Sequence, residues 1–137
     1  MNTNCVTNRL FGLAMPSPEV LQRFIAEVEA NAHVEAIEKF YALHASMQEN
    51  ELPPRIGRET LVANERKALS RMRSVMSECL RPVFVNGDHV AIRWVFKFET
   101  HEGARIRMDE LAYQRWEGDR IVEEKFFYDP QQLQPRR

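Results

Sequence analysis

Residues 89–130, HVAIRWVFKFETHEGARIRMDELAYQRWEGDRIVEEKFFYDP, decide the fold of this chain. They divide into three apolar-rich runs, residues 89–100, 104–116 and 120–129, with short polar breaks between them. Each break contains a glycine, Gly103 or Gly118, and glycine tolerates the positive φ that a tight hairpin turn requires. The three runs are therefore predicted to be consecutive antiparallel strands.

Apolar side chains occupy every second position of the first run, which is the pattern of a strand with one buried face. That face carries Val90, Ile92, Trp94, Phe96 and Phe98. In the second run the corresponding face carries Ile106, Met108, Ala112 and Trp116, together with Glu110 and Gln114. In the third run it carries Val122, Phe126 and Tyr128, together with Glu124. An apolar sheet face that also holds two carboxyl groups and an amide predicts a pocket.

Glu110 is the first candidate for a catalytic residue. A carboxyl group in an apolar cavity has a raised pKa, which suits a general acid or base near neutral pH. Two alternatives stay open: a bulge exposes Glu110 to solvent, or an arginine pairs with it. Glu124 is a candidate by the same argument, although a slip of one residue would exchange it with Glu123.

Other side chains of these strands are candidates for ligand contacts. Gln114 could orient a carbonyl group, or bond to the backbone as inward glutamines commonly do. An aromatic lining is expected from Trp94, Phe96, Trp116, Phe126 and Tyr128. The alternative for each aromatic residue is a place in the ordinary core.

The bulk composition is that of one globular domain. The chain has 137 residues and a net charge of −1, with no long basic run, so a nucleic-acid-binding surface is not expected. No apolar stretch approaches the roughly 20 residues of a membrane span. Cys5 and Cys79 are far apart and predict free thiols in a reducing cytoplasm.

No motif predicts a cofactor. The histidines His33, His44, His89 and His101 show no metal-binding spacing, and no nucleotide-binding fingerprint occurs. We expect a flexible arm over residues 1–16, one pocket domain over residues 17–130 and a tail over residues 131–137.

Helical patterns occur in the first half of the chain. A helix is predicted to begin at Ser17-Pro18-Glu19, a second to run from His33 to about Tyr41, and a third from Gly57 to about Met72. Residues 42–50 have no helical stripe and predict a short strand. Residues 75–85 predict a fourth strand before the Asn86-Gly87-Asp88 turn, with Pro82 at a bulge or an edge. The fold class is therefore α+β, with three N-terminal helices packed on a bent, four-stranded antiparallel sheet.

This order of elements resembles the nuclear transport factor 2-like superfamily, in its SnoaL-like and ketosteroid-isomerase-like branch. Four stretches carry the resemblance: residues 20–24, residues 34–47 (VEAIEKFYALHASM), residues 55–58 (RIGR) and residues 118–130 (GDRIVEEKFFYDP). The resemblance implies a cone-shaped, cystatin-like fold of helices around a bent sheet, with a pocket inside. It also implies a homodimer through the outer sheet face, where residues such as Val95, Leu111 and Tyr113 would meet a second copy.

Functional positions of the relatives fall on several residues of this chain. The oxyanion-hole tyrosine and aspartate of ketosteroid isomerase match Phe24 and Ala112, and its catalytic base falls near Glu49. An acid of limonene epoxide hydrolase falls at Phe126. SnoaL-like cyclases use a single acid/base carboxyl group, which this chain can supply. Tyr41 and His44 lie where the helical hairpin of relatives ends at the pocket mouth, so they are positioning candidates.

Two functions follow from the resemblance. The first is a cofactor-independent isomerase, cyclase or lyase acting on a small hydrophobic carbonyl compound, with Glu110 or Glu49 as the base. The second is a non-catalytic module that binds a small ligand or forms a dimer. A pocket acid neutralised by a buried arginine, or a pocket filled by Trp94 and Phe96, would favour the second function.

Overall fold

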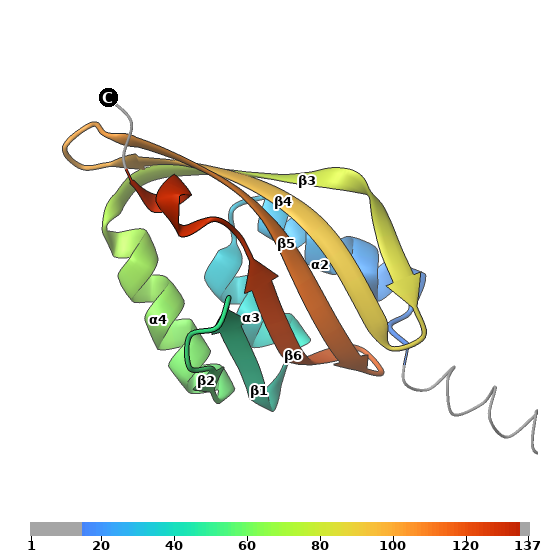
Figure 1. Ribbon diagram of the computed structural model, residues 1–137. Helices are drawn as coiled ribbons and strands as arrows, with labels where there is room; N and C mark the ends of the chain where they lie inside the picture. Colours follow the sequence, from blue (N-terminus) through green and yellow to red (C-terminus); the bar gives the residue numbers. More distant parts are fainter. Residues whose placement is uncertain (1–14, 135–137) are drawn as a thin grey trace, which may run out of the picture.

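The computed structural model describes residues 15–134, which fold as helices packed against one curved sheet (Figure 1). The helices are α2 (Pro18–Glu29), α3 (His33–Phe40) and α4 (Arg58–Ser70), and a 3-10 turn, η1 (Pro130–Leu133), follows the last strand. The strands are β1 (Tyr41–Glu49), β2 (Arg55–Ile56), β3 (Met72–Asn86), β4 (His89–Thr100), β5 (Arg105–Glu117) and β6 (Arg120–Phe127). Most of the expected arm and the end of the expected tail lie outside the described residues.

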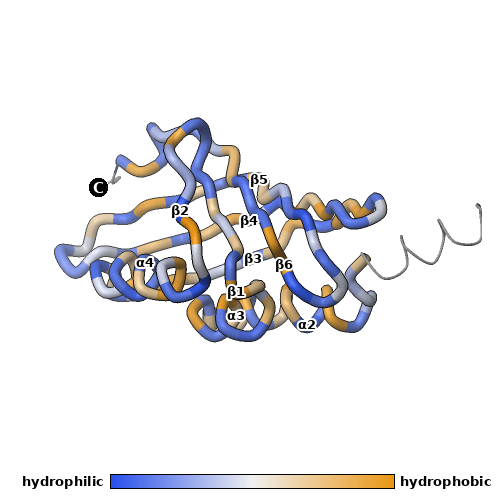
Figure 2. Tube along the Cα trace, turned by 90° about the horizontal axis from the view of Figure 1, so that it is seen from below, coloured by the Kyte–Doolittle hydropathy of each residue, from blue (hydrophilic) through white to orange (hydrophobic). Residues whose placement is uncertain are grey.

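The helix starts follow from local chemistry. The Ser17 hydroxyl accepts a hydrogen bond from the Val20 backbone N–H, and Pro18 occupies the first helical position of α2. Helix α2 then buries a stripe of apolar residues, Val20, Leu21, Phe24, Ile25 and Val28. Figure 2 shows α2, α3 and α4 lying along the same side of the sheet, which places the core between the two layers.

The sheet differs from the prediction of four antiparallel strands. It has six strands in the order β2-β1-β6-β5-β4-β3 and is mixed, because β1 runs parallel to β6. The hairpins from β3 to β6 are confirmed. The pairing of β1 with β6 was missed because the two strands are far apart in sequence and no turn joins them. The predicted order of two helices, a short strand, a third helix and then the hairpins is confirmed, with the two-residue strand β2 added before α4.

Strand β3 explains the position of Pro82. The pairing of β3 with β4 shifts register between Leu80 and Phe84, and β3 lies at the edge of the sheet. Proline has no backbone N–H to donate, so an edge strand with an irregular register accommodates it. Both predicted features, a bulge and an edge, are present.

Two further findings concern membrane spans and the cysteines. Across residues 15–134, no helix is long and apolar enough to cross a membrane. Cys79 is a free, buried cysteine on β3, whereas Cys5 lies outside the described residues.

Candidate functional site

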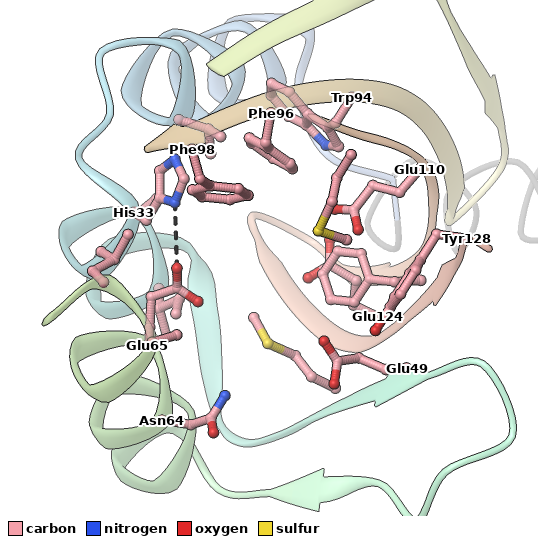
Figure 3. A pocket seen from close by; sticks show the side chains of 18 of the residues that line it. His33, Glu49, Asn64, Glu65, Trp94, Phe96, Phe98, Glu110, Glu124 and Tyr128 are labelled. Atoms are coloured by element: carbon pink, nitrogen blue, oxygen red, sulfur yellow. Dashed lines mark hydrogen bonds and ion pairs between the residues drawn. The ribbon is translucent and has the colours of Figure 1, made fainter. Parts of the chain in front are cut away.

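A cavity of about 300 Å³ lies between the inner face of the sheet and the helices (Figure 3). Strands β4 and β5 supply its aromatic and apolar wall, and α3 and α4 close the opposite side. The polar side chains in its lining are His33, Tyr41, Glu49, Asn64, Glu65, Glu110, Glu124 and Tyr128. The other aromatic side chains in its lining are Phe24, Trp94, Phe96, Phe98 and Phe126.

Glu110 projects into this cavity from the middle of β5. Its burial pattern follows the predicted alternation, so only 8% of the residue is exposed, and Trp94 is its direct partner on β4. Within residues 15–134, no side chain donates a hydrogen bond to its carboxyl group and no arginine pairs with it. Burial, followed by the negative charges of Glu124, Glu49 and Glu65, raises the pKa of Glu110 to about 8.

Glu124 enters the cavity from β6 and is held by a buried network. The Tyr41 hydroxyl donates to its Oε1, and Gln114 Nε2 donates to its Oε2 over 2.6 Å. Trp116 Nε1 in turn donates to Gln114 Oε1 over 2.9 Å, which fixes the orientation of the amide. Burial raises the pKa of Glu124 to about 7, although the two donors favour the charged form and oppose that rise.

Glu49 and Tyr128 form the rim of the cavity, with different surroundings. Glu49 Oε2 forms an ion pair with Arg55 Nη1 over 3.3 Å, and both side chains remain partly exposed. Burial, and then the neighbouring Glu49 carboxylate, raises the pKa of Tyr128 to about 12. Glu49 is therefore a solvated, paired carboxylate, unlike Glu110.

A polar cluster that the sequence analysis missed lies at the other end of the cavity. His33 Nδ1 is 3.3 Å from Glu65 Oε1, and His33 Nε2 is 2.7 Å from Ser77 Oγ. The His33 ring packs edge-on against Phe96, with 5.4 Å between the ring centroids. One signal was present in the sequence, because Glu65 shares a helical stripe with Leu61, Ala68 and Leu69. The position of Ser77 opposite this cluster had no comparable signal.

Three of the candidate residues lie outside the cavity lining. His44 is exposed on β1, because it precedes the buried Ala45 and successive strand residues point to opposite faces. Gln114 and Trp116 are fully buried, and they act on the cavity only through Glu124. The lining does include the other candidates, Phe24, Tyr41, Glu49, Trp94, Phe96, Glu110, Glu124, Phe126 and Tyr128.

The charge of the lining is one-sided. Four glutamates line the cavity, and within the described part of the chain no lysine or arginine does. In residues 15–134, no three histidine, cysteine or acidic side chains come together as a metal site. The cavity is thus mostly apolar and aromatic, and it holds two carboxyl groups, Glu110 and Glu124, whose pKa values are raised by burial.

The family assignment rests on a direct sequence match. Residues 21–124 match the SnoaL-like domain family. This chain belongs to that family. The matched segment of this SnoaL-like domain extends from α2 to Glu124 and so contains nearly the whole cavity. None of the curated proteins matches the chain.

Solved structures agree with the assignment. A candidate SnoaL-like polyketide cyclase from Mesorhizobium loti is 26% identical, with a TM-score of 0.68, and the match covers 80% of this chain and 97% of that one. A protein with a ketosteroid isomerase-like fold from Catenulispora acidiphila, in complex with trimethylamine, is 18% identical, with a TM-score of 0.71 over 85% of this chain and 89% of that one. An epoxide hydrolase of the limonene type from M. tuberculosis is 10% identical, with a TM-score of 0.68 over 84% of each chain. The last two likenesses show the fold alone.

Proposed function

We propose that this SnoaL-like domain carries out cofactor-independent acid/base chemistry on a small hydrophobic carbonyl compound, as an isomerase, cyclase or lyase. The observation that carries the proposal is Glu110, a buried carboxyl group that faces a cavity of about 300 Å³ and has no polar partner among residues 15–134. A group whose pKa lies near 8 is suited to exchange protons with a substrate near neutral pH.

The surroundings of Glu110 support a division of roles. Glu124 is a second carboxyl group in the same cavity, and Tyr41 and Gln114 hold it in place. Because burial raises both pKa values and hydrogen bonds oppose the rise only at Glu124, one carboxyl group can carry a proton while the other is ionised. In the proposed reaction the ionised group removes a proton from the carbon next to the carbonyl, and the protonated group hydrogen-bonds to the carbonyl oxygen.

The non-catalytic alternative receives less support from the cavity. An arginine partner is found at the rim residue Glu49, but within residues 15–134 none pairs with Glu110 or Glu124. Trp94 and Phe96 lie along the wall and leave the cavity open. Both features favour a site in which a carboxyl group meets a ligand.

The test is hydrogen–deuterium exchange at carbon. Cyclic ketones and 1,3-diketones would be incubated with the protein in D2O and followed by proton NMR. We expect exchange above the buffer rate, and we expect Glu110→Gln to slow it about 100-fold or more, the usual contribution of a general acid/base. Glu123→Gln, on the opposite face of β6, is the matched control and should keep the rate. Exchange equal to buffer across the panel, or exchange that survives Glu110→Gln, would contradict the proposal.

We also propose that the domain is a homodimer through the outer face of the sheet. Of the expected residues, Leu111 and Tyr113 are exposed there, whereas Val95 is only 5% exposed. Further apolar surface on the same face is exposed at Met76, Phe84 and Phe127. Exposed apolar area interspersed with Arg93 and Arg115 is typical of an interface. We further propose a cytoplasmic location, because the two widely spaced cysteines favour free thiols in a reducing compartment.

A further inference from the structure

We propose that the natural ligand of the cavity carries a positively charged nitrogen, as a protonated tertiary amine or a quaternary ammonium group, on an apolar body. This inference rests on the part of the proposed function that makes the cavity the ligand site. It does not depend on any reaction. Three features of the cavity support it: the sign of its charge, a buried carboxyl group that has no partner among residues 15–134, and an aromatic wall beside that group.

The charged groups around the cavity are mainly carboxylates, and basic side chains neutralise only some of them. Arg55 compensates Glu49 at the rim, and His33 lies next to Glu65 on the far side. Among the described residues, the donors to Glu124 are the neutral side chains of Tyr41 and Gln114, which orient its charge without cancelling it. A cavity of this kind favours a cationic ligand and disfavours an anionic one.

Glu110 is the group that lacks a partner. It is more than nine-tenths buried and is directed into the cavity, and within residues 15–134 no hydrogen-bond donor reaches it. Among the described residues, no fully buried side-chain oxygen is left without a partner, so the Glu110 carboxyl group is accessible from the cavity and can meet a ligand there. A ligand ammonium group placed against it supplies the missing opposite charge.

The wall beside Glu110 is aromatic. Trp94 is paired with Glu110 across β4 and β5, so their side chains stand next to each other on the inner face. Phe96 stacks on Trp94, with 5.7 Å between ring centroids and 17° between ring planes. An alkylated ammonium group at Glu110 therefore also meets aromatic rings, which attract cations through their negative faces. The apolar body of the ligand would extend toward Phe98 and the helices.

Binding of such a cation is coupled to proton release. The groups that face Glu110 are Glu124 and Tyr128 at β6, Tyr41 and Glu49 on β1, Glu65 on α4 and His33 on α3. A cation stabilises ionised Glu110, so a ligand of fixed charge binds more tightly as the pH rises toward the pKa of about 8. The same ligand would in turn lower the pKa of Glu110.

The experiment compares two probes of the same shape and different charge, with an anionic probe added. Benzyltrimethylammonium has a charged nitrogen where neopentylbenzene has a carbon atom. Phenylacetate is the anionic probe. Binding is measured by ligand-detected NMR and by tryptophan fluorescence. At pH 8.5 we expect benzyltrimethylammonium to bind at least about 10-fold more tightly than neopentylbenzene, and phenylacetate not to bind. Between pH 6.5 and 8.5 the affinity for benzyltrimethylammonium should rise about 10-fold, because Glu110 ionises with a pKa of about 8.

Two variants test whether Glu110 causes the preference for the cation and the pH dependence of its binding. Glu110→Gln should remove most of the charge preference and most of the pH dependence, whereas Glu123→Gln removes an outward carboxylate of β6 and should change neither. Equal affinity for the two isosteres, or a pH-independent affinity for the cation, would overturn the inference even if Glu110→Gln failed to fold. Cation binding without deuterium exchange would reject the proposed reaction and leave this inference standing. Deuterium exchange without a preference for the cation would reject this inference and leave the proposed reaction standing.

Discussion

The hydroxyl group of Tyr41 donates a hydrogen bond to the carboxyl group of Glu124, a residue 83 positions further along the chain. The contact exists because β1 and β6 pair in parallel, with Tyr41 aligned to Ile121 and Met47 to Glu124. It is buried, and it is the direct link between the strand that follows α3 and the carboxyl pair of the cavity.

Tyr41→Phe should destabilise the protein more at high pH than at low pH. The variant removes one of two donors to Glu124, so the pKa of Glu124 rises further and its charged form becomes costlier. We expect a loss of about 1.5–3 kcal/mol in the free energy of unfolding at pH 8.5, and about 0.5–1.5 kcal/mol at pH 5.5, where Glu124 is protonated. Urea melts at the two pH values measure the difference. The exposed control Tyr113→Phe should change stability by less than about 0.5 kcal/mol. An equal cost at both pH values would mean that Glu124 does not titrate in this range.

Glu110→Gln should stabilise the protein at neutral and alkaline pH. The pKa of Glu110 is about 8 in the folded state, above the value of about 4.3 in an unfolded chain. The folded state therefore holds the proton more tightly. The stability linked to it is fully present below the unfolded pKa and is lost as the pH rises through the folded pKa.

The advantage of Glu110→Gln over the parent should accordingly grow between pH 4.5 and pH 8, to the order of 3 kcal/mol. Paired urea melts at pH 5 and pH 8 measure the difference in stability, and carboxyl-carbon NMR of Glu110 measures its pKa. A lowered pKa combined with a loss of stability at pH 8 would count against Glu110 and move attention to Glu49.

His33→Ala should loosen the far end of the cavity. His33 joins α3 to Glu65 of α4 and to Ser77 of β3, so the variant removes both contacts and part of the packing on Phe96. We expect a cost of about 1–3 kcal/mol in the free energy of unfolding. A double-mutant cycle of His33→Ala with Glu65→Gln should show a coupling free energy that a cycle of His33→Ala with Glu59→Gln lacks. Equal coupling in the two cycles would show that the pair does not interact.

The outer sheet face should hold two copies together. Light scattering at micromolar concentration should give twice the 16.1 kDa mass of the chain. Tyr113→Asp, which places a charge within the exposed apolar group, should shift the mass toward one chain. Leu43→Asp changes an exposed apolar residue of β1 outside that group and should leave the mass unchanged. A parent protein with the mass of one chain would reject the dimer.

Local patterns in the sequence determined much of this protein. The alternation along residues 89–130, the glycine-containing breaks and the Ser17 cap act over a few residues, so the hairpins of β3 to β6 and the start of α2 could be predicted. The same alternation placed Glu110 and Glu124 on the buried face, because successive strand residues point to opposite sides.

Only the tertiary structure decided which of these groups meet. The parallel pairing of β1 with β6 brings Tyr41 to Glu124, and the docking of α3 and α4 brings His33 to Glu65 and Ser77. These contacts join residues that no turn or helical spacing relates. They form because buried donors and acceptors must find partners once the layers pack, and that choice depends on the whole arrangement of the chain. The sequence therefore predicted the position of Glu110, whereas the packing around it decided that no polar side chain of the described residues pairs with it.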